Sequence, residues 1–103
     1  MKLRIHQNSL RIRLSEDEVG KLLAERRLEN RICFGADGAL AYAIGLSSNV
    51  DTANVSFDGK ELRVDLAEPL AKALGEGGEV GIRENLETPE GMLELLIERD
   101  RQP

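Results

Sequence analysis

Aromatic residues, cysteine and histidine are scarce in this chain of 103 residues, which contains no tryptophan, one tyrosine, two phenylalanines, one cysteine and one histidine. A single cysteine cannot form a disulfide within the chain. Together with a single histidine it cannot supply the four ligands of a structural zinc site. The sequence therefore predicts no disulfide framework and no metal centre, and we expect no cofactor.

Long apolar segments are missing as well. No stretch approaches the roughly 18 consecutive apolar residues that a transmembrane helix needs. Residues 1–7 alternate apolar with charged or polar side chains, whereas a secretory signal has a continuous apolar segment. We therefore expect a cytoplasmic protein that makes no contact with membranes.

Charged residues are plentiful and unevenly distributed along the chain, whose formal net charge is -5. Residues 1–34 hold eight basic and five acidic residues, whereas residues 35–103 hold six basic and fourteen acidic ones. Either the basic segment attracts an anionic partner, or it lies beside the acidic segment in the fold and pairs with it. We favour pairing, because it needs no ligand. An acidic chain with few aromatics is also a poor candidate for binding nucleic acid.

Two alternating segments open the chain, at residues 2–6 and 10–14. A period of two places successive side chains on opposite faces of a β-strand, one face buried and one wet. The intervening polar residues 7–9 favour a turn, so we expect a hairpin or one strand broken by a bulge. The side chains expected to point inward are Leu3, Ile5, Leu10, Ile12 and Leu14. Those expected to point outward are Lys2, Arg4, His6, Arg11 and Arg13.

The next segment carries the signals of a helix. Ser15 is suited to the N-cap, and Glu18 stands three residues later, as a capping box requires. The three acidic residues of the first turn also suit the positive end of the helix dipole, so we interpret them as helix-stabilising and not as metal ligands. Val19, Leu22 and Leu23 lie at helical spacing and predict the buried face.

Alternation returns at residues 28–34 and 40–46, which we expect to form two strands. In the second strand, bulky side chains occupy one face. Small side chains occupy the other face, namely Ala39, Ala41, Ala43 and Gly45. A face of small residues predicts close packing against a helix, a neighbouring chain or a ligand.

A hairpin is expected at residues 53–66. The dipeptide Asp58-Gly59 separates two strand segments and is preferred in a two-residue type I′ turn. The alternation predicts a buried face on this hairpin. Its members are Val55, Phe57, Leu62, Val64 and Leu66.

A second, short helix is predicted at residues 67–74. Gly75 is well placed to end this helix in the left-handed conformation. Two more strands are expected, at residues 80–82 and 92–98, and residues 99–103 are expected to fray.

These elements predict one α+β domain over residues 1–103. Adjacent strand pairs favour a mainly antiparallel sheet built from hairpins, with the two short helices on one face. Two ββα units, one early and one late, hint at an internal duplication, although the residues match too weakly to define a repeat.

The outward-facing basic residues of the first two strands are the candidate ligand-binding site. Arginine can grip a phosphate or a carboxylate through a bidentate fork. The alternative is a solvated sheet face with cross-strand ion pairs, which is the commoner arrangement. Glu94 and Glu98 are the acidic residues that could lie opposite Arg11 or Arg13. The basic set consists of Lys2, Arg4, His6, Arg11 and Arg13.

No catalytic residue can be assigned from the sequence. His6 has no recognisable nucleophile or orienting partner and is expected on a wet strand face. Cys33 is expected to be a small filler within a strand. A Cys–His pair would form only if these two side chains met across strands, so whether the protein is an enzyme stays open.

Residues 2–15 read KLRIHQNSLRIRLS and are followed by Glu18-Val19. This opening resembles a family of small bacterial proteins of unknown function, in which a basic strand, Asn-Ser and a second basic strand follow one another. The resemblance extends through Phe34-Gly35, the hairpin at residues 57–59 and the segment 95–100. It implies no activity and no catalytic residue.

Two functions are compatible with these observations. We prefer a non-enzymatic cytoplasmic binding or assembly domain that forms a homodimer through a sheet face or edge, as the small-residue face suggests. The alternative is a small enzyme or sensor that holds an anionic small molecule on the basic face.

Overall fold

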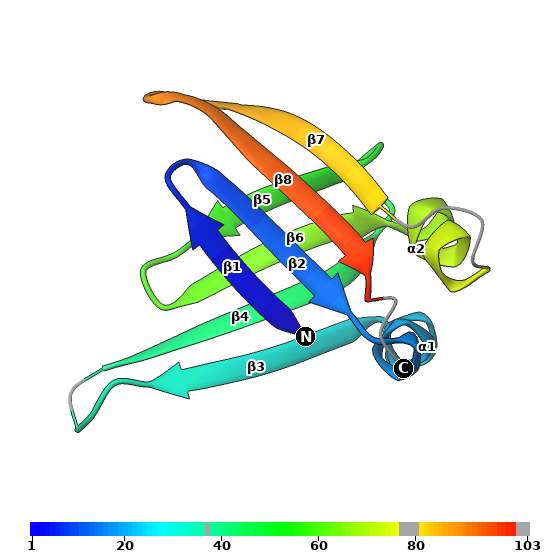
Figure 1. The fold of residues 1–103 in the computed structure, drawn as a ribbon, viewed down its shortest axis with the longest axis horizontal. Coiled ribbons are helices and arrows are strands. Elements are labelled where there is room, and N and C mark those ends of the chain that lie inside the picture. Colours follow the sequence, from blue (N-terminus) through cyan, green and yellow to red (C-terminus); the bar gives the residue numbers. More distant parts are fainter. Residues whose placement is uncertain (37, 77–80, 101–103) are drawn as a thin grey trace.

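The computed structural model describes residues 1–36, 38–76 and 81–100, in which eight strands and two helices occur. The predicted order of hairpins and helices is confirmed (Figure 1). The strands are β1 (Lys2–His6), β2 (Ser9–Leu14), β3 (Arg27–Cys33), β4 (Ala39–Ser47), β5 (Ala53–Phe57), β6 (Glu61–Ala67), β7 (Gly81–Thr88) and β8 (Gly91–Arg99). The helices are α1 (Glu16–Glu25) and α2 (Glu68–Gly75). The start of the strand predicted at 80–82 and the last three residues of the predicted tail lie outside the described residues.

The α+β class is confirmed and four of the six strand pairings are antiparallel, but the prediction of a single sheet is wrong. Within the described ranges, the strands form two four-stranded sheets, with the orders β1-β2-β8-β7 and β3-β4-β6-β5. Each hairpin is antiparallel internally, but the hairpins are joined in parallel, β2 to β8 and β4 to β6. Side-chain alternation identifies a hairpin but carries no information about which hairpins become neighbours.

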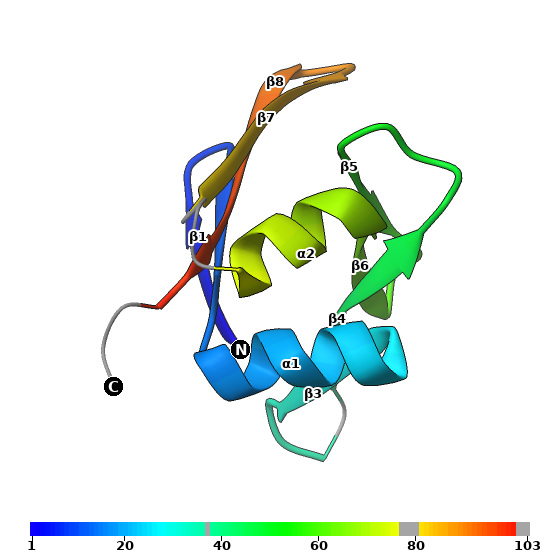
Figure 2. The same cartoon turned by 90° about the vertical axis from the view of Figure 1, so that its right-hand side faces the viewer.

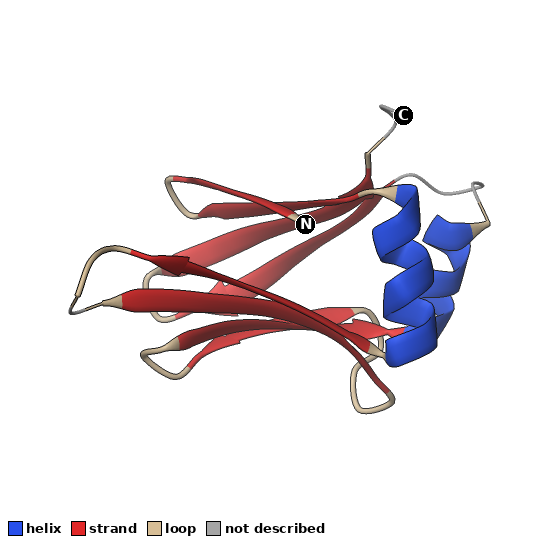
Figure 3. Cartoon of the chain, turned by 90° about the horizontal axis from the view of Figure 1, so that it is seen from below, coloured by secondary structure: helices blue, strands red, loops and turns tan. Residues whose placement is uncertain are grey.

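Both helices lie across one end of the two-sheet sandwich, and the prediction that they cover one sheet face is wrong (Figures 2 and 3). The hairpin turns gather at the opposite end, which we call the hairpin end (Figure 1). Helix α1 leads from β2 in the first sheet to β3 in the second, and α2 leads from β6 back to β7. A helix that links two stacked sheets must cross from one layer to the other, so it closes the end of the stack.

The two halves of the chain repeat one topology. The half β1-β2-α1-β3-β4 and the half β5-β6-α2-β7-β8 each place their first hairpin in one sheet and their second hairpin in the other. The first hairpins have equivalent registers, since Leu3 pairs with Ile12 and Val55 pairs with Val64. The repetition suggested by the element order is therefore present in the strand pairing.

The core lies between the sheets, toward the helix end. Inward-facing side chains become more exposed toward the hairpin end: Leu3 packs against the core, whereas Ile5, two residues further along β1, is 64% exposed. On β5, Val55 packs against the core and Phe57 is 60% exposed. Burial of Ile5 and Phe57 is thus a wrong prediction. The largest fully buried side chains are Ile12, Leu14, Leu22, Ile44, Leu66, Leu74, Leu95, Ile97, Val19 and Val64.

Helix α1 begins with the predicted capping box. The Ser15 hydroxyl accepts a hydrogen bond from the backbone N–H of Glu18 at 3.1 Å, and the Glu18 carboxylate accepts one from the N–H of Ser15 at 2.9 Å. Val19 and Leu22 are buried, as the helical spacing predicts. The helix ends at Arg26, whose φ of 68° is left-handed, and β3 starts at the next residue.

Gly75 does not end α2 in the left-handed conformation, which corrects a second prediction. It is the last helical residue, and the C-cap Glu76 is right-handed. A Cβ at Gly75 would lie 3.1 Å from Cδ1 of Leu23 and 3.5 Å from Cγ1 of Val19, both on α1. A side chain at this position would therefore crowd Leu23 where the two helices approach each other.

The turn between β5 and β6 is not type I′, because that turn needs positive φ at both central residues. The turn runs from Asp58 to Glu61, and its central residue Gly59 has a φ of 96°, whereas Lys60 is not left-handed. The Oδ1 atom of Asp58 accepts hydrogen bonds from the N–H groups of Lys60 at 2.8 Å and Glu61 at 2.7 Å. The bonds from Glu61 and then Lys60 hold the pKa of Asp58 below its ordinary value. Side-chain capping therefore stabilises this turn.

Candidate functional site

The candidate basic residues lie together on the outer face of the β1-β2 hairpin. The antiparallel register places Arg4 opposite Arg11 and Lys2 opposite Arg13. The alternate side chains of β2 are buried in the core, so the basic side chains point away from it. His6 lies on the same face of β1, beside the turn. The fold thus brings all members of the predicted set onto one surface.

Glu98 of β8 pairs with two of the arginines. Its Oε1 atom accepts hydrogen bonds from Nε of Arg11 and from Nε of Arg13, both at 2.6 Å. On the edge strand, Nζ of Lys2 donates to Oδ2 of Asp100 at 3.1 Å. The pairing of the basic N-terminal segment with the acidic C-terminal one, expected from the charge distribution, is confirmed.

These contacts change the acidity of the groups involved. Partial burial tends to raise the pKa of Glu98, but the hydrogen bonds and charges of Arg13 and Arg11 outweigh burial and hold this pKa below its ordinary value. The hydrogen bond to Glu98 raises the pKa of Arg13. Glu94, the other acidic residue considered, is aligned with Ser9 instead of an arginine.

Arg4 is surrounded by basic residues. Lys2 and His6 are its neighbours on the outer face of β1, and Arg11 lies directly opposite on β2. No ion pair or hydrogen bond joins the Arg4 side chain to another residue in the described ranges. Like charges opposite each other in a sheet are destabilising, so the stability of the fold does not explain this arrangement.

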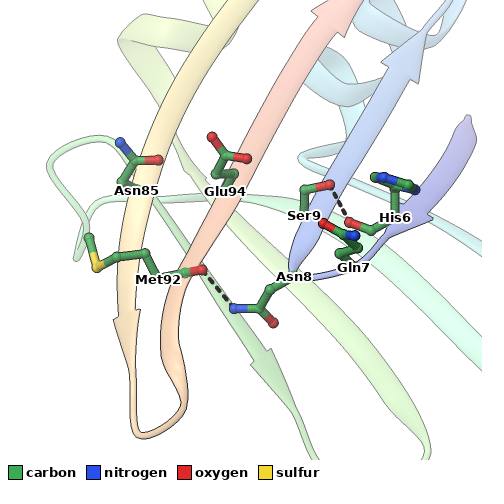
Figure 4. Close-up of a pocket in the computed structure, with 7 residues that line it drawn as sticks. All are labelled: His6, Gln7, Asn8, Ser9, Asn85, Met92 and Glu94. Atoms are coloured by element: carbon green, nitrogen blue, oxygen red, sulfur yellow. Dashed lines mark hydrogen bonds between the residues drawn. The ribbon is translucent and has the colours of Figure 1, made fainter.

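Two open depressions adjoin the basic face near the β1-β2 turn. The first, of about 460 Å³, is lined by Arg4, Ile5, His6, Ser9 and Arg11. The second, of about 430 Å³, shares His6 and Ser9 with the first and continues over β8 and β7 (Figure 4). Together they offer a ligand a polar surface with arginines on one side.

A row of polar side chains crosses the sheet within the second depression. It runs from His6 on β1 through Ser9 and Glu94 to Asn85 on β7. The Ser9 hydroxyl donates to the backbone carbonyl of His6 at 2.6 Å (Figure 4). Because this proton is held by a carbonyl and not by a base, the serine is not an activated nucleophile in this arrangement.

The small-residue face of β4 is covered by the chain's own charged side chains. Arg27 on β3 reaches across β4 to Glu61 on β6, with Nη2 and Oε2 2.9 Å apart. Arg63 also pairs with Glu61, at 3.3 Å. Ala43, on the strand between them, is only 2% exposed. Small side chains leave room for this ion pair, which lies over the middle of the face.

Cys33 and His6 do not form a pair. Cys33 is exposed on the edge strand of the second sheet, whereas His6 belongs to the edge strand of the first. Over the described ranges, no group of three or more His, Cys, Asp or Glu residues is placed to hold a metal ion. Neither α1 nor α2 is long and apolar enough to cross a membrane.

Sequence reasoning missed a second surface, at the hairpin end. Among the described residues, the large apolar side chains exposed there are Ile5, Ile32 and Phe57 on inward-facing strand positions and Phe34 directly after β3, and we call this set the apolar hairpin end. Their exposed fractions are 64%, 46%, 68% and 60%. Each lies beside a turn, beyond the last layer of the core. In the sequence, each of these residues stands close to turn residues. The alternation pattern by itself does not take that position into account.

Fold and surfaces define this protein as a small α+β sandwich with a basic outer face and an apolar end. The chain belongs to DUF7009, a family of unknown function, whose model matches residues 1–102. The match confirms that the chain belongs to a family of unknown function, which is the part of the resemblance that it tests. No curated protein and no solved structure matches the chain.

Proposed function

We propose that the protein is a non-enzymatic binding or assembly domain that forms a homodimer through its apolar hairpin end. The observation that carries this proposal is the exposure of Ile5, Ile32, Phe34 and Phe57 at one end of the sandwich. Burying a large apolar side chain stabilises a complex by roughly 1.5–3 kcal/mol. Clusters of exposed apolar side chains on soluble proteins mark interaction sites.

A second copy of the chain fits the symmetry of this end. Ile5 and Phe57 occupy equivalent positions in the two halves. Leu3 and Val55 are equivalent to each other, and Ile5 and Phe57 each follow one of them by two residues. The pair Ile5 and Phe57 therefore repeats about the axis that relates the halves, whereas Ile32 and Phe34 have no exposed large apolar counterpart on β7. Two-fold homodimers are the commonest oligomers, and their interfaces are self-complementary.

Two features support the non-enzymatic and cytoplasmic parts of the proposal. The Ser9 hydroxyl near His6 is bound to a carbonyl and lacks a base. Cys33 is a free, exposed thiol, which suits a reducing compartment.

The oligomeric state of paired variants tests this proposal. We expect sedimentation equilibrium to give a dimer for the wild type and a monomer for the double variant Phe34→Ser/Phe57→Ser. The matched control is Met92→Ser, since Met92 is 50% exposed but lies on the outer face of β8. That control should remain dimeric. A wild type that is monomeric at high concentration, or a double variant that remains dimeric, would overturn the proposal.

A further inference from the structure

The basic face holds more positive charge than its own carboxylates neutralise. The charged side chains Lys2, Arg4, Arg11 and Arg13 share the outer face of β1-β2, and the carboxylates paired with them come from Glu98 and Asp100. Among these six side chains a local excess of about two positive charges persists, in a chain whose formal net charge is -5, and the carboxylate of Glu94 lies at its edge, aligned with Ser9. A field of this kind concentrates anions.

We propose that Arg4 and Arg11 bind the phosphate group of a phosphorylated small molecule in the first depression. Arg4 and Arg11 occupy opposite positions on β1 and β2, and both line this depression together with Ile5, His6 and Ser9. An anion between the arginines replaces the repulsion between them with charge-assisted hydrogen bonds. Arg4 contributes the whole fork of its guanidinium, since no other described residue is bound to it.

Charge and shape favour phosphate over a carboxylate. A phosphate monoester carries close to two negative charges at neutral pH and presents three acceptor oxygens, which matches the local excess and two separate arginines. A carboxylate has one charge and is satisfied by a single fork. The depression opens into its neighbour over Glu94 and Asn85, so the uncharged part of the ligand has a polar surface to lie on (Figure 4).

Glu98 competes with the ligand for Arg11. Its carboxylate accepts from Nε of Arg11 at 2.6 Å and also holds Arg13. Removing its charge while keeping its shape leaves both arginines available to an anion. The Glu98→Gln variant should therefore bind phosphate more tightly than the wild type, a direction that loss of folding cannot imitate.

Titration with inorganic phosphate, followed by amide chemical shifts at constant ionic strength, tests the site. We expect saturable shifts at β1 and the β1-β2 turn in the wild type. The Arg4→Gln variant should bind phosphate about tenfold more weakly, because it loses one charge-assisted hydrogen bond to the ligand. The matched control is Arg83→Gln, because Arg83 is exposed on the outer face of the same sheet, at the opposite edge. It should change the affinity less than twofold.

Parallel titrations separate the possible anions. Phenyl phosphate should bind more tightly than inorganic phosphate if the second depression contributes, whereas equal affinities would identify free phosphate as the ligand within the same site. Acetate should give no saturable shift. The proposal is overturned if phosphate gives no localised saturable shift, if Arg83→Gln weakens binding as much as Arg4→Gln, or if Glu98→Gln does not strengthen it. The dimer test changes Phe34 and Phe57, which line neither depression, so the two proposals can fail separately.

Discussion

For single residues, the direction of a side chain and its burial are separate properties in this protein. Val64 and Phe57 both occupy inward-facing positions of the β5-β6 hairpin, yet Val64 is 1% exposed and Phe57 is 60% exposed. Alternation determines the direction correctly in both cases, because it follows from strand geometry. Burial depends on what the opposite sheet places over each position, and the sequence does not reveal this.

Replacing Phe57 by Ala should therefore cost little stability. Its ring is mostly in solvent, so we expect the free energy of unfolding to fall by less than about 1 kcal/mol. Leu66→Ala is the comparison, since Leu66 is fully buried, and it should cost about 2–5 kcal/mol. Urea unfolding of the two variants, at a concentration where the wild type is monomeric, gives both values. Equal losses would place Phe57 in the core.

The capping box of α1 makes a second prediction for a single residue. Ser15→Ala removes the hydroxyl that accepts from the N–H of Glu18, and should lower the free energy of unfolding by about 1 kcal/mol. Ser48→Ala is the control, because Ser48 is exposed in the loop between β4 and β5. A loss for Ser15→Ala no larger than for the control would contradict the cap.

The pKa of Glu98 predicts a pH dependence of stability. This pKa is lower in the folded than in the unfolded protein. The ionised Glu98 carboxylate therefore stabilises the fold fully above the unfolded pKa, and this stabilisation is lost as pH falls through the folded pKa. Comparing the wild type with Glu98→Gln isolates it. We expect the free energy of unfolding of the wild type to exceed that of the variant by about 1 kcal/mol at neutral pH, and this difference should shrink in acid. Urea unfolding across the pH range measures it, and a difference that grows in acid would refute the assignment.

At the scale of elements, local signals identified the hairpins and helices but not their neighbours. Ser15 and Glu18 marked the start of α1, because a capping box is a contact within one turn. Gly75 was predicted to end α2 in the left-handed conformation, whereas its role depends on its contact with Leu23 of α1. The small face at Ala43 was predicted to pack against a helix, a neighbouring chain or a ligand, whereas Arg27 and Glu61 of the adjacent strands lie over it. Each error concerns a contact between elements distant in the sequence.

The contrast between two helical glycines tests this interpretation of α1 and α2. Gly20 lies within α1, and a Cβ there would meet nothing within 4 Å, so Gly20→Ala should stabilise the protein by about 1 kcal/mol through helix propensity. Gly75→Val places a branched side chain against Leu23 and should destabilise by about 1–3 kcal/mol. Thermal unfolding compares the two. A stabilising Gly75→Val would mean that the helices do not need this close approach.

For the whole molecule, the sequence predicted the composition of the basic face but not its counterions. The positions of Arg11 and Arg13 on one face follow from alternation within β2. Their pairing with Glu98 depends on the parallel contact between β2 and β8, which joins the two halves of the chain. The same contact makes the halves interdependent, because each half supplies one hairpin to each sheet.

This interdependence predicts that neither half of the chain folds alone as a monomer. A lone hairpin is marginally stable in water, and the parallel pairings of β2 with β8 and of β4 with β6 both cross between halves. We expect the fragments 1–49 and 50–103 to lack cooperative unfolding separately and to form a one-to-one complex with β-sheet circular dichroism when mixed. Val64→Asp in the second fragment should abolish assembly, because Val64 is buried and pairs with Ile44 of the first fragment. Arg63→Gln, on the exposed face of the same strand, should not. A fragment that unfolds cooperatively as a monomer would show that one half can form a core without the other. The parallel pairings between the halves would then not be required for folding.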